Sequence, residues 1–116
     1  MATDEIRGGG YTVRHDRAAH AVLFEGSLRL RRAADYAPIL ALLEQAWGSR
    51  DEPLTVDLRA LQFLNSAGIQ ALLMLAARLR DAGRSGVLRG SSQVRWHGQL
   101  LTNLQQLFPA FVLRLE

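Results

Sequence analysis

The chain has 116 residues, 48% of them hydrophobic and 22% charged, which is ordinary for a single soluble globular domain. Its net charge of +3 is too small to indicate nucleic-acid binding, and its 14 basic residues, all arginine, are scattered among acidic ones. The absence of cysteine excludes a disulfide framework, a thiolate metal site and a thiol nucleophile. No apolar run reaches the roughly 18 to 20 residues of a membrane helix, and the N-terminus lacks the apolar core of a secretory signal. We therefore expect a cytoplasmic protein without membrane insertion.

The N-terminal part is predicted to contain a flexible lead-in followed by two strands. Residues 1–10 end in three consecutive glycines, which are typical of flexible chain, and residues 11–116 are predicted to form one domain. Residues 11–16 alternate as a half-buried strand does, and an apolar run from Ala21 to Phe24 predicts a second strand. Because only a short connection around residues 17–19 separates the two strands, we expect them to pair antiparallel.

From Ala33 onwards the pattern alternates between helical and strand periods. The predicted helices cover residues 33–47, 66–83 and 91–107, and the predicted strands cover residues 54–64, 86–90 and 108–116. Trp47 and Trp96 are expected to lie partly in the core, because large aromatic side chains at helical spacing usually pack inward. This alternation predicts an α/β fold with right-handed crossovers and a mainly parallel central sheet, preceded by an antiparallel strand.

The sequence offers little support for an enzyme. His15, His20 and His97 lack metal-ligand spacing, and we expect His15 and His20 at the surface. His97 could approach an end of the sheet from the last helix, but "LNSAG" is not the nucleophile elbow of a serine hydrolase. Phosphate-binding glycine motifs are also missing. We expect no catalytic activity, no metal and no cofactor.

The segment Asn65-Ser66-Ala67-Gly68 stands where a strand must become a helix. A helix N-cap explains one polar residue there, because its side-chain oxygen accepts from unpaired backbone N–H groups. The same place, at the carboxyl end of a parallel strand and the start of a helix, also suits a phosphoryl group on Ser66. The residues alone leave both interpretations open. Ser91 and Ser92 are interpreted as the N-cap of the last helix.

Residues 54–83 resemble the signature of the STAS domain, the fold of bacterial anti-sigma factor antagonists. The match consists of Val56-Asp57-Leu58, then "FLNSAG" and an apolar helix; the segments "LFEGSLRLRRAADYAPIL" and "GVLRGSSQVRWHGQLLTNLQQLFP" are similar to the rest of the family pattern. This resemblance implies that Ser66 is a phosphorylation site, modified by a serine kinase that is also an anti-sigma factor and restored by a phosphatase. Asn65 replaces the family's Asp, and Ala67 replaces its second hydroxyl residue.

The resemblance also implies a protein-docking surface around the start of the Ser66 helix. The residues expected to contribute are Gly26, Ser27, Leu28, Asn65, Ser66, Ala67, Gly68, Ile69 and Gln70. The leading interpretation is an anti-sigma factor antagonist switched at Ser66. The alternative is a STAS subunit that works without phosphorylation, in a transport ATPase or another signalling complex; the change from Asp to Asn65 is its main support.

Overall fold

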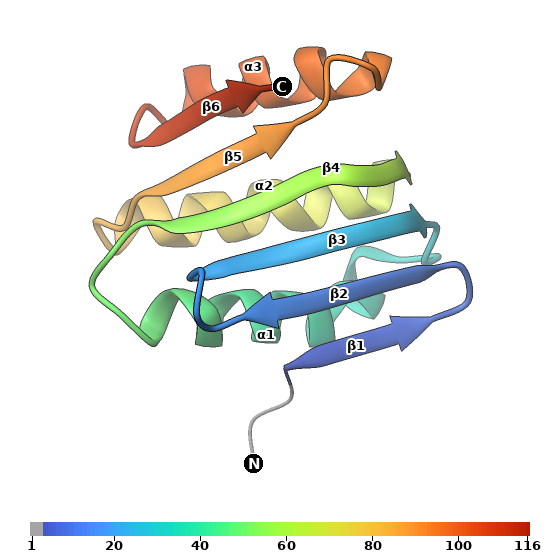
Figure 1. The fold of residues 1–116 in the computed structure, drawn as a ribbon, viewed down its shortest axis with the longest axis horizontal. Helices are drawn as coiled ribbons and strands as arrows, with labels where there is room; N and C mark the ends of the chain where they lie inside the picture. The colour runs from blue at the N-terminus through green and yellow to red at the C-terminus, as the bar shows by residue number, and fades with distance from the viewer. Residues whose placement is uncertain (1–3) are drawn as a thin grey trace.

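A six-stranded sheet with three α-helices on one face forms the protein (Figure 1). The computed structural model describes residues 4–116. The strands are β1 (Glu5–Gly8), β2 (Tyr11–Asp16), β3 (Ala21–Leu28), β4 (Leu54–Leu64), β5 (Gly86–Gly90) and β6 (Phe111–Leu115). The helices are the short 3-10 helix η1 (Ala33–Tyr36) and the α-helices α1 (Ala37–Gly48), α2 (Ser66–Asp81) and α3 (Arg95–Leu107).

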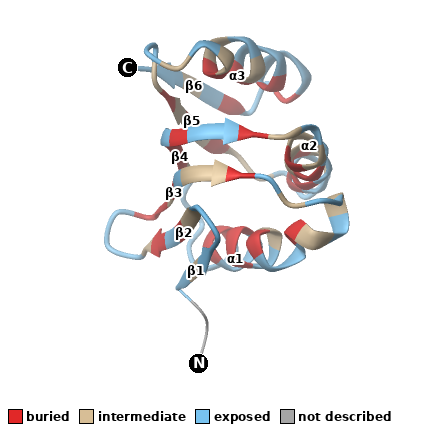
Figure 2. Ribbon diagram, turned by 90° about the vertical axis from the view of Figure 1, so that its right-hand side faces the viewer, coloured by how far each residue is buried: buried red, intermediate tan, exposed pale blue. Residues whose placement is uncertain are grey.

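The strands lie side by side in chain order, β1 to β6. β1–β2 and β2–β3 pair antiparallel, and each later pair is parallel. Since right-handed crossovers that advance in one direction bring every connecting helix to the same side, all three α-helices cover one face and leave the other without helices (Figure 2). The predicted mixed α/β sheet is confirmed. Within residues 4–116, no helix combines the length and the apolarity needed to span a membrane.

The N-terminal segment differs from the predicted flexible lead-in, because Glu5–Gly8 form the edge strand β1. Ile6 pairs with Val13 of β2, and its partly buried side chain packs against the core. Gly10 has a φ of 86° and closes the turn into β2, so these glycines serve a hairpin. Residues 1–3, which also belong to the predicted lead-in, lie outside the described part of the chain.

The core lies between the sheet and the helices. Alternate residues Leu54, Val56 and Leu58 of β4 are buried on the helix-covered side, as the period of a strand requires. Trp47 of α1 is also buried, as predicted, and its ring nitrogen donates to the Ser85 carbonyl at 2.8 Å. Gly86 lies so close to this indole ring that a Cβ there would be 2.8 Å from Trp47 Cζ2.

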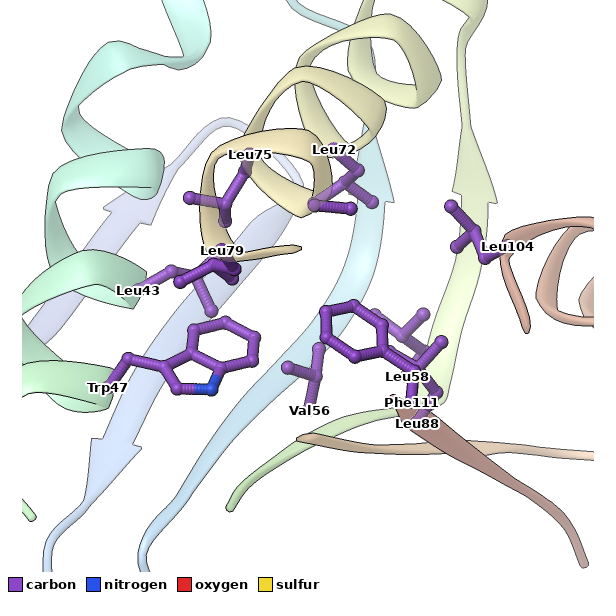
Figure 3. Close-up of a pocket in the computed structure, with 11 residues that line it drawn as sticks. Leu43, Trp47, Val56, Leu58, Leu72, Leu75, Leu79, Leu88, Leu104 and Phe111 are labelled. Atoms are coloured by element: carbon purple, nitrogen blue, oxygen red, sulfur yellow. The ribbon is translucent and has the colours of Figure 1, made fainter. Parts of the chain in front are cut away.

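A small apolar cavity remains between α2 and the sheet (Figure 3). Its volume is about 30 Å³, and side chains such as Leu72, Val56 and Phe111 line it. This volume corresponds to about one water molecule, and the lining offers no polar partner, so the cavity is unsuited to an organic ligand.

The face of the sheet without helices carries a charged network. Asp57 is largely buried there under Arg59, whose guanidinium lies 2.7 Å from its carboxylate. Glu116 joins the network through ion pairs to Arg59 and Arg89. Burial alone would raise the pKa of Asp57, but the hydrogen bonds from Arg59 hold that pKa below its ordinary value.

Candidate functional site

The carboxyl ends of the parallel strands gather several connections at one edge of the molecule. The loop after β3, the start of α2 and the turn between β1 and β2 all lie at this edge, at the right of Figure 1. Ser27 N–H donates to the Gly10 carbonyl at 2.9 Å and so ties β3 to the turn of the N-terminal hairpin. The residues "NSAG" begin α2 in the middle of this edge.

Asn65 is fully engaged in a hydrogen-bond network. Its side-chain oxygen accepts from Gly68 N–H at 3.0 Å, which confirms the predicted N-cap. The same oxygen accepts from the Tyr36 hydroxyl at 2.7 Å, and its Nδ2 donates to the Leu30 carbonyl at 2.7 Å. Asn65 therefore joins α2 to the β3–α1 connection, a role for which the amide supplies both an acceptor and a donor at neutral pH.

Tyr36 is the second member of this network and is buried. Burial raises the pKa of its hydroxyl, so the proton remains available for donation to Asn65. A Cβ on Gly68 would come within 2.8 Å of the Tyr36 oxygen and would also collide with Leu64. Gly68 thus allows the first turn of α2 to lie directly against Tyr36.

Ser66 is the first residue of α2 and is exposed. Its hydroxyl makes no hydrogen bond to any part of residues 4–116 that the structure describes. The cap function belongs to Asn65, so the Ser66 side chain is free to meet another molecule while its backbone is held by a rigid helix start. The cap interpretation of "NSAG" is thus confirmed for Asn65, and phosphorylation of Ser66 stays a prediction.

The other predicted docking residues differ in exposure. Gln70 is exposed, whereas Ser27, Ala67 and Ile69 are half-buried. Gly26 has a φ of 89°, and a Cβ there would collide with the Gly10 carbonyl, so this glycine permits close packing of the hairpin turn. The prediction is wrong for Leu28, because its side chain lies in the core and is unavailable to a partner. Gly68 is likewise buried against Tyr36 and Leu64.

The loop before α3 also differs from its prediction. α3 begins at Arg95 with Val94 as the N-cap residue, so Ser91 and Ser92 do not cap the helix. Ser91 Oγ instead accepts from Gln93 N–H at 3.1 Å in a local turn. Serine has a similar preference for turns and for caps, which is why the sequence could not distinguish them.

His97 is fully buried and holds this loop against β4. Its Nδ1 accepts from Ser91 N–H at 3.0 Å, so the proton must be on Nε2, which donates to the Leu61 carbonyl at 2.9 Å. Burial lowers the pKa of the ring below its ordinary value. Because both nitrogens are occupied, His97 has a structural role and is not placed to act as a base on Ser66.

His15 and His20 are buried, contrary to the predicted surface position. His15 shares the helix-facing side of β2 with Val13, because residues two apart lie on one face. The Nε2 of His20, in the turn between β2 and β3, is 3.0 Å from the Glu52 carbonyl. This turn lies at the end of the sheet opposite the start of α2 (Figure 1). Among residues 4–116, no cluster of three or more His, Asp or Glu side chains could hold a metal ion.

The chain is similar to known proteins in sequence and in structure. A family model described as "Mlab, STAS domain" matches residues 11–108. Apo-SiaC from Pseudomonas aeruginosa superposes with a TM-score of 0.74 at 20% identity, covering 100% of this chain and 99% of that one. A chain of the structure of the diguanylate cyclase SiaD in complex with its activator SiaC, also from Pseudomonas aeruginosa, gives a TM-score of 0.70 at 19% identity and covers 97% and 98%. A comparison with curated proteins gives no match.

Proposed function

The chain belongs to the STAS domain family, and from this membership we propose that it is a non-catalytic, protein-binding regulatory subunit of a signalling assembly. The observation that carries the proposal is the rigid presentation of the exposed Ser66 by the Asn65 network at the start of α2. Such a pre-organised surface lowers the entropic cost of docking. SiaC, which has the same fold, is the activator of a diguanylate cyclase, so a signalling enzyme is our first choice of partner.

The test of this function uses a diguanylate cyclase or another signalling enzyme encoded beside the chain. Binding is measured by calorimetry, and enzyme activity with and without the chain. Gln70→Arg places a bulky charge next to Ser66, whereas Gln105→Arg makes the same change at an exposed position of α3. We expect about a tenfold loss of affinity for the first variant and none for the second. Equal binding by both variants would exclude the Ser66 surface.

The second candidate is the anti-sigma factor antagonist switched by phosphorylation. The free, exposed hydroxyl of Ser66 favours it, because a kinase needs access to the acceptor oxygen. A phosphoryl group there would add about −1.5 to −2 charge to the docking surface. The test is incubation with a serine-kinase anti-sigma factor and ATP, followed by intact-mass measurement; a gain of about 80 Da that is absent from Ser66→Ala supports the switch. Tight binding without a gain in mass supports the first candidate alone.

A further inference from the structure

The loop after β3 places three arginines beside the start of α2. Residues 29–32 read Arg-Leu-Arg-Arg, and the half-buried Leu30 packs against the core. Two hydrogen bonds hold the loop to Asn65: Nδ2 to the Leu30 carbonyl at 2.7 Å, and the backbone N–H to the Leu28 carbonyl at 3.2 Å. The loop is thus fixed next to Ser66, with its arginine side chains exposed.

Two of these arginines have no acidic partner. Arg32 pairs with Asp35 at 3.3 Å, but neither Arg29 nor Arg31 makes an ion pair with any described residue. The Arg29 guanidinium lies 4.6 Å from the ring centroid of Phe63, which is 40% exposed. Arginine and exposed aromatic side chains are the types that dominate binding energy at protein interfaces.

Several of the acidic residues lie at the opposite edge of the sheet. Asp4 precedes β1, Asp16 ends β2, and Asp51 and Glu52 lie in the loop before β4. These segments lie together at the left of Figure 1, away from the loop of residues 29–32. Toward the carboxyl ends of the strands, Asp35 is paired with Arg32, and Glu116 is paired with Arg59 and Arg89. Arg29 and Arg31 therefore keep positive charges that no ion pair in the described part of the chain neutralises. Such a local charge selects partners and speeds their association.

We propose that the partner docks an acidic segment with an apolar side chain on the surface formed by Arg29, Arg31 and Phe63. The acidic groups meet the two unpaired guanidiniums, and the apolar side chain covers the exposed part of the Phe63 ring. This inference rests on the proposed function, since it assumes that a partner docks beside Ser66. A phosphoryl group on Ser66 would compete with the acidic segment for the same arginines, which gives the switch a mechanism of release.

The test selects ligands from a random-peptide phage library on the wild-type chain. We expect the selected peptides to be rich in Asp and Glu next to an aromatic or aliphatic residue. A synthetic peptide of the selected sequence should lose about tenfold in affinity for Arg29→Ala/Arg31→Ala. Arg14→Ala/Arg114→Ala removes the same charge from exposed strand positions and should bind as the wild type does. The single change Arg31→Glu repeats the test with little risk to folding, because the exposed Arg31 side chain makes no hydrogen bond or ion pair within residues 4–116. Neutral or basic peptides, or equal losses in both double variants, overturn the inference.

Two further arms separate this inference from the proposed function. Phosphoserine encoded at position 66 should weaken binding of the acidic peptide. If it does not, while the arginine variants still weaken binding, the surface of Arg29, Arg31 and Phe63 is supported and the phosphorylation switch fails. Conversely, if an intact partner enzyme fails to bind Gln70→Arg and yet binds Arg29→Ala/Arg31→Ala as tightly as the wild type, that result supports the proposed function and overturns the arginine surface.

Discussion

The side-chain oxygen of Asn65 accepts a hydrogen bond at 2.7 Å from the hydroxyl of Tyr36, a residue 29 positions earlier in the chain, and this contact joins η1 to the start of α2. The same oxygen caps α2 through Gly68 N–H. On the opposite side of the amide, Nδ2 donates to the Leu30 carbonyl. A residue that looks like a local cap therefore fixes the relative positions of the loop after β3, η1 and α2.

Asn65→Asp tests the need for an amide. A carboxylate keeps both accepting contacts but places a negative oxygen against the Leu30 carbonyl, where the wild type has a donor. We expect the free energy of unfolding in urea to fall by about 1–3 kcal/mol near neutral pH. Acidification should restore part of the loss relative to the wild type, because the protonated carboxyl can donate. Full stability at neutral pH would show that the Leu30 contact contributes nothing.

Gly68→Ala tests the close packing of α2 on Tyr36. Alanine favours helices, but here its Cβ would collide with Leu64 and lie 2.8 Å from the Tyr36 oxygen. We expect a net destabilisation of about 1–3 kcal/mol in urea unfolding. Gly98→Ala is the matched control in α3, where the nearest atom to a new Cβ is Leu115 Cδ1 at 3.8 Å; it should stabilise by up to about 1 kcal/mol. If both variants are more stable than the wild type, the close packing of α2 on Tyr36 is contradicted.

Periodicity in the sequence predicts the helices and strands whose buried residues repeat regularly. It does not predict features that depend on contacts between residues far apart in the chain. The apolar stripe of α2 and the alternation of β4 are sufficient to predict the parallel part of the sheet. β1 was missed because a four-residue edge strand with one apolar side chain, Ile6, has no readable period. The cap role of Asn65 was visible locally, whereas its bonds to Tyr36 and Leu30 depend on packing. The segment "RLRR" shows Arg29 and Arg31 in the sequence, but only the fold shows that they lack acidic partners among the described residues while Arg32 has one.

Acid should destabilise the protein through His97 and His15, two buried histidines with lowered pKa values. Burial lowers the pKa of His97 below 6.5, so the unfolded chain binds a proton more readily than the folded one. The free energy of unfolding should therefore fall as the pH drops below 6.5, a range above the titration of the carboxylates. His15, with a pKa also lowered by burial, adds to this slope. Urea midpoints at about pH 7 and about pH 5 measure the effect.

His97→Gln separates the contribution of this residue. Glutamine can still donate to the Leu61 carbonyl but does not titrate, so the variant should be less stable overall and lose less stability between the two pH values. In His15→Gln, the part of the pH-dependent loss of stability that is due to His97 should remain. An unchanged pH slope in His97→Gln would show that the ring is not protonated on unfolding in this range.

Ser66→Asp tests whether negative charge at the docking surface is compatible with the fold. Ser66 is the first residue of α2, where the helix dipole is positive and the first N–H groups lack partners. We expect the free energy of unfolding to rise by about 0.3–1 kcal/mol, and Ser66→Arg to lower it by a similar amount. Both effects should shrink in salt of about 1 M, where screening acts over a few ångströms. Because the domain then keeps its fold with a negative group at this position, a phosphoryl group on Ser66 would act by changing the surface that a partner meets. Unfolding of the Asp variant would contradict this and make phosphorylation a disruption of α2.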